Sequence, residues 1–296
     1  MLTGALPLAD DPDGLRSSDR NVLAVALLAS FAVGCGRLGF ETTSDAAPSL
    51  DAGIDAPAPR DAGTDASCSP AGDPCTELRM LATAPTIDGV LEPCLTTVPI
   101  NPVGWTGSIA FPANVHARGA YGWRPNGVYF YVEVDDPNLF PGVPPVATYC
   151  GDGVEIYVDD DGTFSTPGRY DVPGTIQLVA AAPTSTSGTS TYGQRFIEAM
   201  FTANWSSFAM IGRPGGYALE ALVQASDLGR ASWTLTPGQH IGLDVGVNVS
   251  TADGSPGTGT SSCGRRIGQY FLRVARTGAC VDPYCGTAAF CTPVLR

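Results

Sequence analysis

The sequence predicts an all-β protein, a jelly-roll-like antiparallel β-sandwich preceded by a signal peptide and a disordered tether. Apolar and polar residues alternate with a period of two in several runs of the C-terminal two thirds, which is typical of half-buried strands. The chain contains 36 glycines and 25 prolines, which favours short strands joined by turns over long helices. Excluding the N-terminal region leaves roughly 230 residues, a size that suits one β domain.

Residues 1–35 are predicted to be a signal peptide. An uncharged apolar run of fourteen residues, 21–34, is shorter than the about 20 residues of a membrane-spanning helix. Arg16 and Arg20 precede the run, which ends at Cys35 in a sequence that resembles a lipobox. The resemblance implies cleavage before Cys35, lipidation of its thiol and a secreted, lipid-anchored protein of the outer membrane or cell surface. An ordinary cleaved signal with a chance cysteine is the alternative.

Residues 36–67 are predicted to be a disordered tether. The dipeptide Asp-Ala occurs five times between Glu41 and Ser67, among Pro, Gly and Ser. Such a segment cannot bury enough apolar surface to offset the entropy lost on ordering, so we expect a solvated spacer. A cysteine-containing strap, 68–85, then leads into the predicted sandwich, 86–276, and a cysteine-rich tail, 277–296, follows it.

The remaining cysteines indicate disulfides. With Cys35 assigned to lipid, eight are left outside the cytoplasm, an even number that predicts four disulfides among 105 possible connectivities. Zinc is disfavoured because the chain has only 2 histidines and no paired CxxC motifs. The net charge of -13 argues against nucleic acid as a partner, because binding a polyanion needs a basic patch.

Eight or nine strands are expected. Residues 128–134 place four apolar side chains on one face and Tyr129, Tyr131 and Glu133 on the other. Similar alternation predicts strands at 154–159, 217–223 and 241–250. Less regular strands are expected near 114–122, 175–181, 196–202 and 269–275.

The order of four motifs resembles family 9 carbohydrate-binding modules over residues 86–276. The motifs are Ile87–Gly89 followed by Glu92, and then AYGWRPNGVYFYVEVDDP, CGDGVEIYVDDDG and LTPGQHIGLDVGVN. The resemblance implies a jelly-roll sandwich that binds sugar ends without catalysis and is often attached to glycan-degrading enzymes. Aromatic rings and polar side chains are what protein sites use to bind sugars.

The resemblance also implies four ligand-binding residues: Tyr149, Glu155, Asp136 and Gln177. Tyr149 stands where the family has its first tryptophan, whereas Gln177 replaces an arginine. Gly246 replaces a glutamine, and the loop 251–266, which should bring the second tryptophan, contains no aromatic residue. Half of the aromatic clamp is therefore missing, and Glu155 could equally lie on a solvated strand face with Tyr149 packed under a loop.

Two further expectations concern the loops around this site. In the resembled fold the loops of Cys150 and Cys263 face each other, which implies a disulfide between them. Asp159, Asp160 and Asp161 supply oxygen ligands of the kind that calcium prefers, although a surface turn explains them equally well. No other cofactor is indicated.

These features favour a surface-displayed lipoprotein that binds a glycan end or an oligosaccharide. The alternative is an envelope structural or protein-interaction lipoprotein that keeps the sandwich and has lost the sugar site. A hydrolase is a third hypothesis, in which Glu133 and Glu155 would form a carboxylate pair on adjacent strands. The chain contains no GxSxG or HExxH motif and no lysine, so we expect no enzyme activity.

Overall fold

The computed structural model describes residues 72–104, 112–141, 148–162, 174–197, 200–250, 266–273 and 290–296. The chain divides into two compact units, 1–60 and 61–296, and every described residue lies in the second. The signal peptide, Cys35 and the tether predicted from the sequence therefore lie outside the described residues, as does Cys263. No helix within the described ranges is long and apolar enough to cross a membrane.

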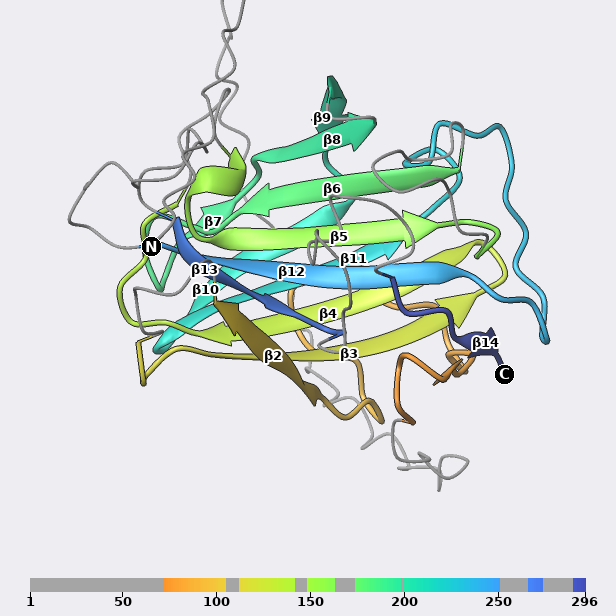
Figure 1. Cartoon of the computed structure of the whole chain (residues 1–296), viewed down its shortest axis with the longest axis horizontal. Helices are drawn as coiled ribbons and strands as arrows, with labels where there is room; N and C mark the ends of the chain where they lie inside the picture. Colours follow the sequence, from red (N-terminus) through yellow and green to blue (C-terminus); the bar gives the residue numbers. More distant parts are fainter. Residues whose placement is uncertain are drawn as a thin grey trace, which may run out of the picture. The chain divides into compact units, whose positions relative to one another are not determined.

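Strands make up nearly all of the regular structure, which confirms the predicted all-β fold class (Figure 1). The described residues form one short 3-10 helix, η1 at Thr148–Cys150, and fourteen strands. The strands are β1 (Glu77–Leu78), β2 (Val98–Gly104), β3 (His116–Arg124), β4 (Gly127–Asp135), β5 (Gly153–Asp159), β6 (Thr175–Ala181), β7 (Thr189–Ser190), β8 (Gly193–Ile197), β9 (Met200–Trp205), β10 (Phe208–Arg213), β11 (Gly216–Val223), β12 (Gly242–Ser250), β13 (Arg266–Phe271) and β14 (Val294–Leu295).

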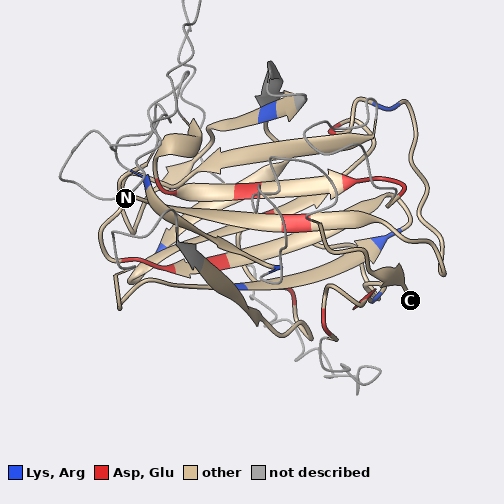
Figure 2. Cartoon of the chain, viewed as in Figure 1, with Lys and Arg blue, Asp and Glu red and all other residues tan. Residues whose placement is uncertain are grey.

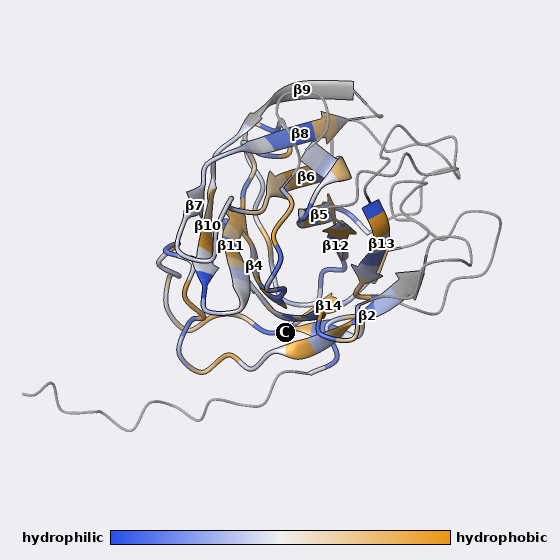
Figure 3. Ribbon diagram, turned by 90° about the vertical axis from the view of Figure 1, so that its left-hand side faces the viewer, coloured by the Kyte–Doolittle hydropathy of each residue, from blue (hydrophilic) through white to orange (hydrophobic). Residues whose placement is uncertain are grey.

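Twelve of these strands form one antiparallel sheet in the order β7-β10-β11-β4-β3-β2-β13-β12-β5-β6-β8-β9. The sheet folds over at β2, because residues 98–100 of this strand pair with β3 whereas 101–104 pair with β13. One half, from β7 to β3, therefore faces the other half, from β13 to β9 (Figure 3). We call them the β4 half and the β5 half.

The main core fills the space between the two halves. The β4 half contributes Phe130 and Val132, and the β5 half contributes Ile156 and Leu178, all of them fully buried. These are the apolar positions of the alternating runs, so the predicted inward faces of 128–134 and 154–159 are confirmed. Burying one such side chain stabilises the fold by about 1.5–3 kcal/mol.

A second, smaller core lies on the outer face of the β4 half. It contains Tyr129 and Tyr131, with Leu81 and the partly buried Ile87 packed against them. The segment before β2 thus covers this face, and the two tyrosines, expected on the face opposite the main core, are buried there.

Glu220 of β11 anchors this covering segment. Its fully buried carboxylate accepts hydrogen bonds from the backbone N–H groups of Asp88 and Gly89, both at 2.8 Å, and from the hydroxyl of Tyr129 at 2.7 Å. Gly89 has a φ of 84°, a conformation that favours glycine. The Ile87–Gly89 motif is therefore a turn whose amides are bound by a buried acid.

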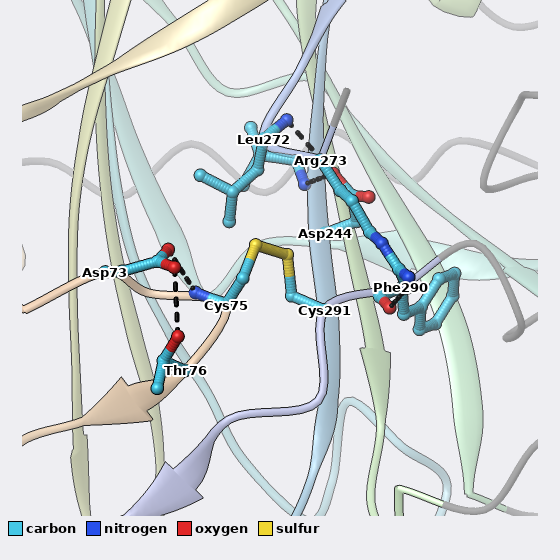
Figure 4. The surroundings of a disulfide bond; sticks show 9 residues. Asp73, Cys75, Thr76, Asp244, Leu272, Arg273, Phe290 and Cys291 are labelled. Carbon is cyan, nitrogen blue, oxygen red and sulfur yellow. Dashed lines mark hydrogen bonds between the residues drawn. A yellow bond between two sulfur atoms is a disulfide. The ribbon is translucent and has the colours of Figure 1, made fainter. Parts of the chain in front are cut away.

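The two ends of the described domain are tied together. β1 and β14 pair in parallel, and a disulfide joins Cys75 to Cys291, whose Cα atoms are 4.5 Å apart (Figure 4). Trp123 donates from Nε1 to the carbonyl oxygens of Leu78 at 3.1 Å and Arg296 at 3.0 Å.

Fourteen strands are described where eight or nine were expected, and β1, β7, β10 and β14 are among those not predicted. The strand expected near 196–202 is a hairpin, β8 and β9, and β13 begins earlier than the expected 269. β2 was not predicted, because Pro99 and Pro102 interrupt its sequence. Both prolines nevertheless occupy paired positions, opposite Arg118 and Tyr270.

Candidate functional site

Polar side chains gather on the outer face of the β5 half, on the opposite side of that sheet from the main core. Glu155 points to this face from the middle of β5, and its side chain is only 2% exposed. Its Oε1 accepts a hydrogen bond from Asn248 Nδ2 at 2.7 Å, and its Oε2 accepts one from Gln177 Nε2 at 3.1 Å. The hydroxyl of Tyr157 also donates to Oε2. Acidic positions within β5 and β12 are visible in Figure 2.

Arg266, at the start of β13, extends this arrangement. Its Nη1 lies 3.8 Å from Glu155 Oε1 and donates to Asn248 Oδ1 at 3.2 Å and to the carbonyl oxygen of Tyr149 at 3.3 Å. Gln269 Nε2 donates to the same Asn248 oxygen at 2.6 Å. We call this group of six side chains the Glu155 cluster: Glu155, Tyr157, Gln177, Asn248, Arg266 and Gln269.

Aromatic rings lie beside the cluster. Tyr149 is half-buried in η1, and its ring meets that of Phe196 edge to face, with centroids 6.0 Å apart. Phe196 on β8 is paired with Gln177 on β6, so the alternation of side chains places both on the same face of the sheet. Tyr149 is thus linked to the cluster through Phe196 and through Arg266.

Gly246 stands where the family resemblance implies a glutamine, and the space of that side chain is filled by a neighbouring residue. A Cβ atom at this position would lie 3.2 Å from the Phe271 ring and 3.4 Å from the Glu155 side chain. Phe271, which is 1% exposed, therefore occupies the space that a longer side chain at 246 would need.

Asp136 belongs to a different group. It is 4% exposed at the end of β4 and accepts a hydrogen bond from the N–H of Asn138 at 2.9 Å. Within the described part of the chain, no hydrogen bond joins Asp136 to the Glu155 cluster. Burial raises the pKa of Asp136.

Asp152, next to η1, is the electrostatic neighbour of Asp136. Its fully buried carboxylate accepts hydrogen bonds from the backbone N–H groups of Phe140 at 2.5 Å and Ser250 at 2.7 Å. Burial raises the pKa of Asp152 to about 8, the charge of Asp136 adds to this, and the two backbone hydrogen bonds oppose it. Asp152 thus joins the chain after β4 and the end of β12 to the start of β5.

The structure brings together three of the four ligand-binding residues expected from the sequence, namely Tyr149, Glu155 and Gln177, and places Asp136 apart. Cys150 is disulfide-bonded, but Cys263 lies outside the described residues, so their pairing stays a prediction.

The three consecutive aspartates at the end of β5 place their carboxylate oxygens within 4.8 Å of one another. Asp160 forms an ion pair with Arg230, and burial raises the pKa of Asp159 to about 7. Their carboxylate oxygens are of the kind that calcium prefers, and calcium binding here stays a prediction.

Comparison with known families decides the assignment. The model of the carbohydrate family 9 binding domain-like proteins matches residues 87–264, more than half of the 296 residues. The chain belongs to this family. No curated protein sequence matches the chain significantly.

Two solved structures of a family 9 module from Caldicellulosiruptor kristjanssonii also resemble this family 9 domain, one in complex with cellotriose and one with glucose. Each is 17% identical in sequence, with a TM-score of 0.49 and coverage of 75% of this chain. The similarity covers 94% of the cellotriose structure and 96% of the glucose structure.

Several residues of this family 9 domain were not identified from the sequence as parts of the site. Asn248 alternates with apolar residues in the run 241–250, and this position on the polar face is the signal that could have found it. Arg266 and Phe271 carried no such signal, because their contacts depend on the register between β12 and β13.

Proposed function

We propose that this domain binds carbohydrate, without catalysis, on the face of the β5 half that carries the Glu155 cluster. The cluster combines a carboxylate, amides and a guanidinium group beside the half-buried ring of Tyr149, and these are the groups that recognise sugar hydroxyls and stack on sugar C–H faces. This combination is the observation that carries the proposal. Membership of a family of carbohydrate-binding domains supports it.

The composition of the cluster favours binding over hydrolysis. A glycosidase needs two carboxyl groups, about 5–9.5 Å apart across the bond that is cleaved. Glu155 is the one acidic residue among the six members of the cluster as the described residues define it. Glu133, considered as its partner from the sequence, lies on β4 in the other half of the sheet and pairs with Arg118 at 2.8 Å.

The burial of Glu155 favours a second candidate function, a structural or protein-interaction role in which the sugar site is lost. Both of its carboxylate oxygens already accept hydrogen bonds from protein side chains, and the side chain is 2% exposed. A sugar hydroxyl would have to displace one of these donors in order to bind the carboxylate.

Calorimetric titration of the purified protein with glucose and with neutral oligosaccharides separates the two functions. We expect weak binding, nearer millimolar than micromolar, because among the described residues Tyr149 is the partly exposed aromatic residue found to contact the cluster. Tyr149→Ala should weaken binding about tenfold, which is the effect of losing about 1.4 kcal/mol of stacking. Trp233→Ala, which truncates another half-buried aromatic residue, should leave the affinity unchanged.

Absence of binding by the parent protein at millimolar sugar would reject the carbohydrate proposal and favour the interaction role. Equal losses in the two variants would place the ligand away from Tyr149.

We further propose that the protein is displayed on the outer membrane or cell surface through lipid on Cys35. The apolar run 21–34, too short to span a bilayer, and the lipobox-like sequence before Cys35 support this proposal. The parent protein should partition into the detergent phase and Cys35→Ser should not. A serine variant that partitions like the parent would contradict the lipid anchor.

A further inference from the structure

The end of the chain packs against the Glu155 cluster. Residues 290–296, which we call the C-terminal strap, begin with Phe290, whose side chain is fully buried. Its ring lies against that of Tyr157 of β5, with centroids 5.7 Å apart and planes inclined by 58°. These two residues form an apolar cluster of their own, separate from the main core.

The position of Phe290 is fixed by the backbone around it. The next residue, Cys291, exchanges two backbone hydrogen bonds with Leu243, at 2.8 and 2.9 Å, and is joined to Cys75 by the disulfide. Arg273 Nη1 donates to the carbonyl oxygen of Phe290 at 2.6 Å (Figure 4). Phe290 is thus held in place by backbone hydrogen bonds to β12, by Arg273 after β13 and by the disulfide to Cys75, which precedes β1.

The sequence of β12 leaves room for this ring. Gly242 lies beside Phe290, and a Cβ atom there would lie 3.1 Å from the ring and 2.7 Å from the Cβ atom of Asp159. A larger residue at 242 would have to displace one of them, because cores tolerate little additional volume.

Tyr157 connects this packing to the proposed carbohydrate site. Its hydroxyl donates to Glu155 Oε2 and accepts a hydrogen bond from Gln177 Nε2 at 3.2 Å. The ring of Tyr157 therefore has Phe290 against it, while its hydroxyl orients two of the polar groups expected to meet the ligand.

We propose that Phe290 is a positioning residue for carbohydrate binding: through Tyr157, the C-terminal strap fixes the orientation of Glu155 and Gln177. The inference rests on the proposed function and adds a part of the chain beyond residues 87–264, which the family model matches. Phe290 itself does not touch the ligand.

A double-mutant cycle on the full chain tests this coupling, with glucose and neutral oligosaccharides as probes. Tyr157→Phe keeps the ring packing and removes the hydroxyl, and should weaken binding about tenfold. Phe290→Ala should also weaken it about tenfold. The double variant should bind no worse than twofold below either single variant, because both act through the same hydroxyl.

Two further variants separate positioning from loss of stability. Phe290→Leu keeps apolar volume, should remain folded and should weaken binding about threefold. Leu81→Ala removes apolar contacts from the smaller core on the opposite half and should leave the affinity unchanged. Unchanged affinity in folded Phe290 variants, or losses that add to that of Tyr157→Phe, would overturn the inference.

Hydrogen exchange provides a readout that does not need a sugar. Amides of β5 and β6 should exchange about tenfold faster in Phe290→Leu than in Leu81→Ala variants of matched stability. Equal exchange rates would overturn the positioning role. If instead the exchange differs and the parent binds no sugar, the positioning role stands while the proposed function fails.

Discussion

Replacing Glu155 with glutamine tests how the site is built. The carboxylate accepts hydrogen bonds from Tyr157, Gln177 and Asn248 and faces Arg266 at 3.8 Å, at 2% exposure. Glutamine can keep its oxygen toward Asn248 and present its amide to Tyr157, but Gln177 Nε2 then faces another donor. The side chain of Gln177 can rotate to offer its Oε1, a buried atom without a hydrogen-bond partner, so part of the network can be rebuilt.

The expected loss of stability in Glu155→Gln follows from the change in charge. Three hydrogen bonds to a carboxylate become neutral ones, each weaker by about 1 kcal/mol, while an amide costs less to bury than a carboxylate. We therefore expect Glu155→Gln to lower the free energy of unfolding by about 2 kcal/mol in urea denaturation at pH 7. Sugar affinity, where the parent shows it, should fall about tenfold.

Glu133→Gln is the matched control. Glu133 also lies in a strand and pairs with Arg118 at 2.8 Å, but its side chain is 18% exposed and that of Arg118 is 44% exposed. Because solvent screens such a pair, we expect a cost below about 1 kcal/mol. If Glu155→Gln proves no more costly than Glu133→Gln, the cluster does not hold the β5 half together and the reasoning fails.

Three other predictions concern the rest of the domain. Gly89→Ala should cost about 2 kcal/mol in urea denaturation, because the new Cβ meets a positive φ of 84° and would lie 2.7 Å from Ile211; a neutral substitution would contradict the turn geometry. The pKa of Asp152, raised to about 8, exceeds the about 4 of an unfolded chain, so the folded state binds its proton more tightly between these values. The free energy of unfolding should therefore fall as pH rises from 4 to 8, with a shallower slope in Asp152→Asn, and an unchanged slope would refute this origin. Removing the disulfide by the double substitution Cys75→Ser and Cys291→Ser should cost about 5 kcal/mol in the chain-entropy model, since it links positions 216 residues apart. A thermal unfolding midpoint equal to that of the parent would exclude such a contribution.

The strands that could be predicted are those in which apolar and polar residues alternate along the sequence, with the apolar residues buried. Val128 to Val134 and Val154 to Val158 each bury every second residue in the main core, so a period of two sufficed. β2 could not be found in this way, because Pro99 and Pro102 cannot donate to the sheet and its pairing changes partner within seven residues.

The candidate site was predictable only where a motif carried it. Glu155 lies in the CGDGVEIYVDDDG motif and Tyr149 directly precedes it, and the structure places both around the same cluster. Apart from Tyr157 on β5 itself, the partners of Glu155 come from β6, β12 and β13, up to 111 positions away, and no local pattern specifies which residues of those strands meet. The role of Phe290 is even less predictable from the sequence, because its contact with Tyr157 depends on the C-terminal strap, which a disulfide holds in place.

The disulfide also determines how the domain would bear load. Cys75 and Cys291 lie beside the beginning of β12, whereas Arg266 and η1 contact the residues at its end, Asn248 and Ser250. Leu243, the partner of Cys291, lies five to seven positions before Asn248 and Ser250 along β12, which is about 17–23 Å at ~3.3 Å per residue. Were the chain held from its N-terminal side, a pulling force would enter at Cys75 and pass through a covalent bond to Cys291. The force would then reach β12 through the Cys291–Leu243 backbone hydrogen bonds and Tyr157 through its contact with Phe290, so a load at the N-terminal side would be carried by the residues that orient the Glu155 cluster.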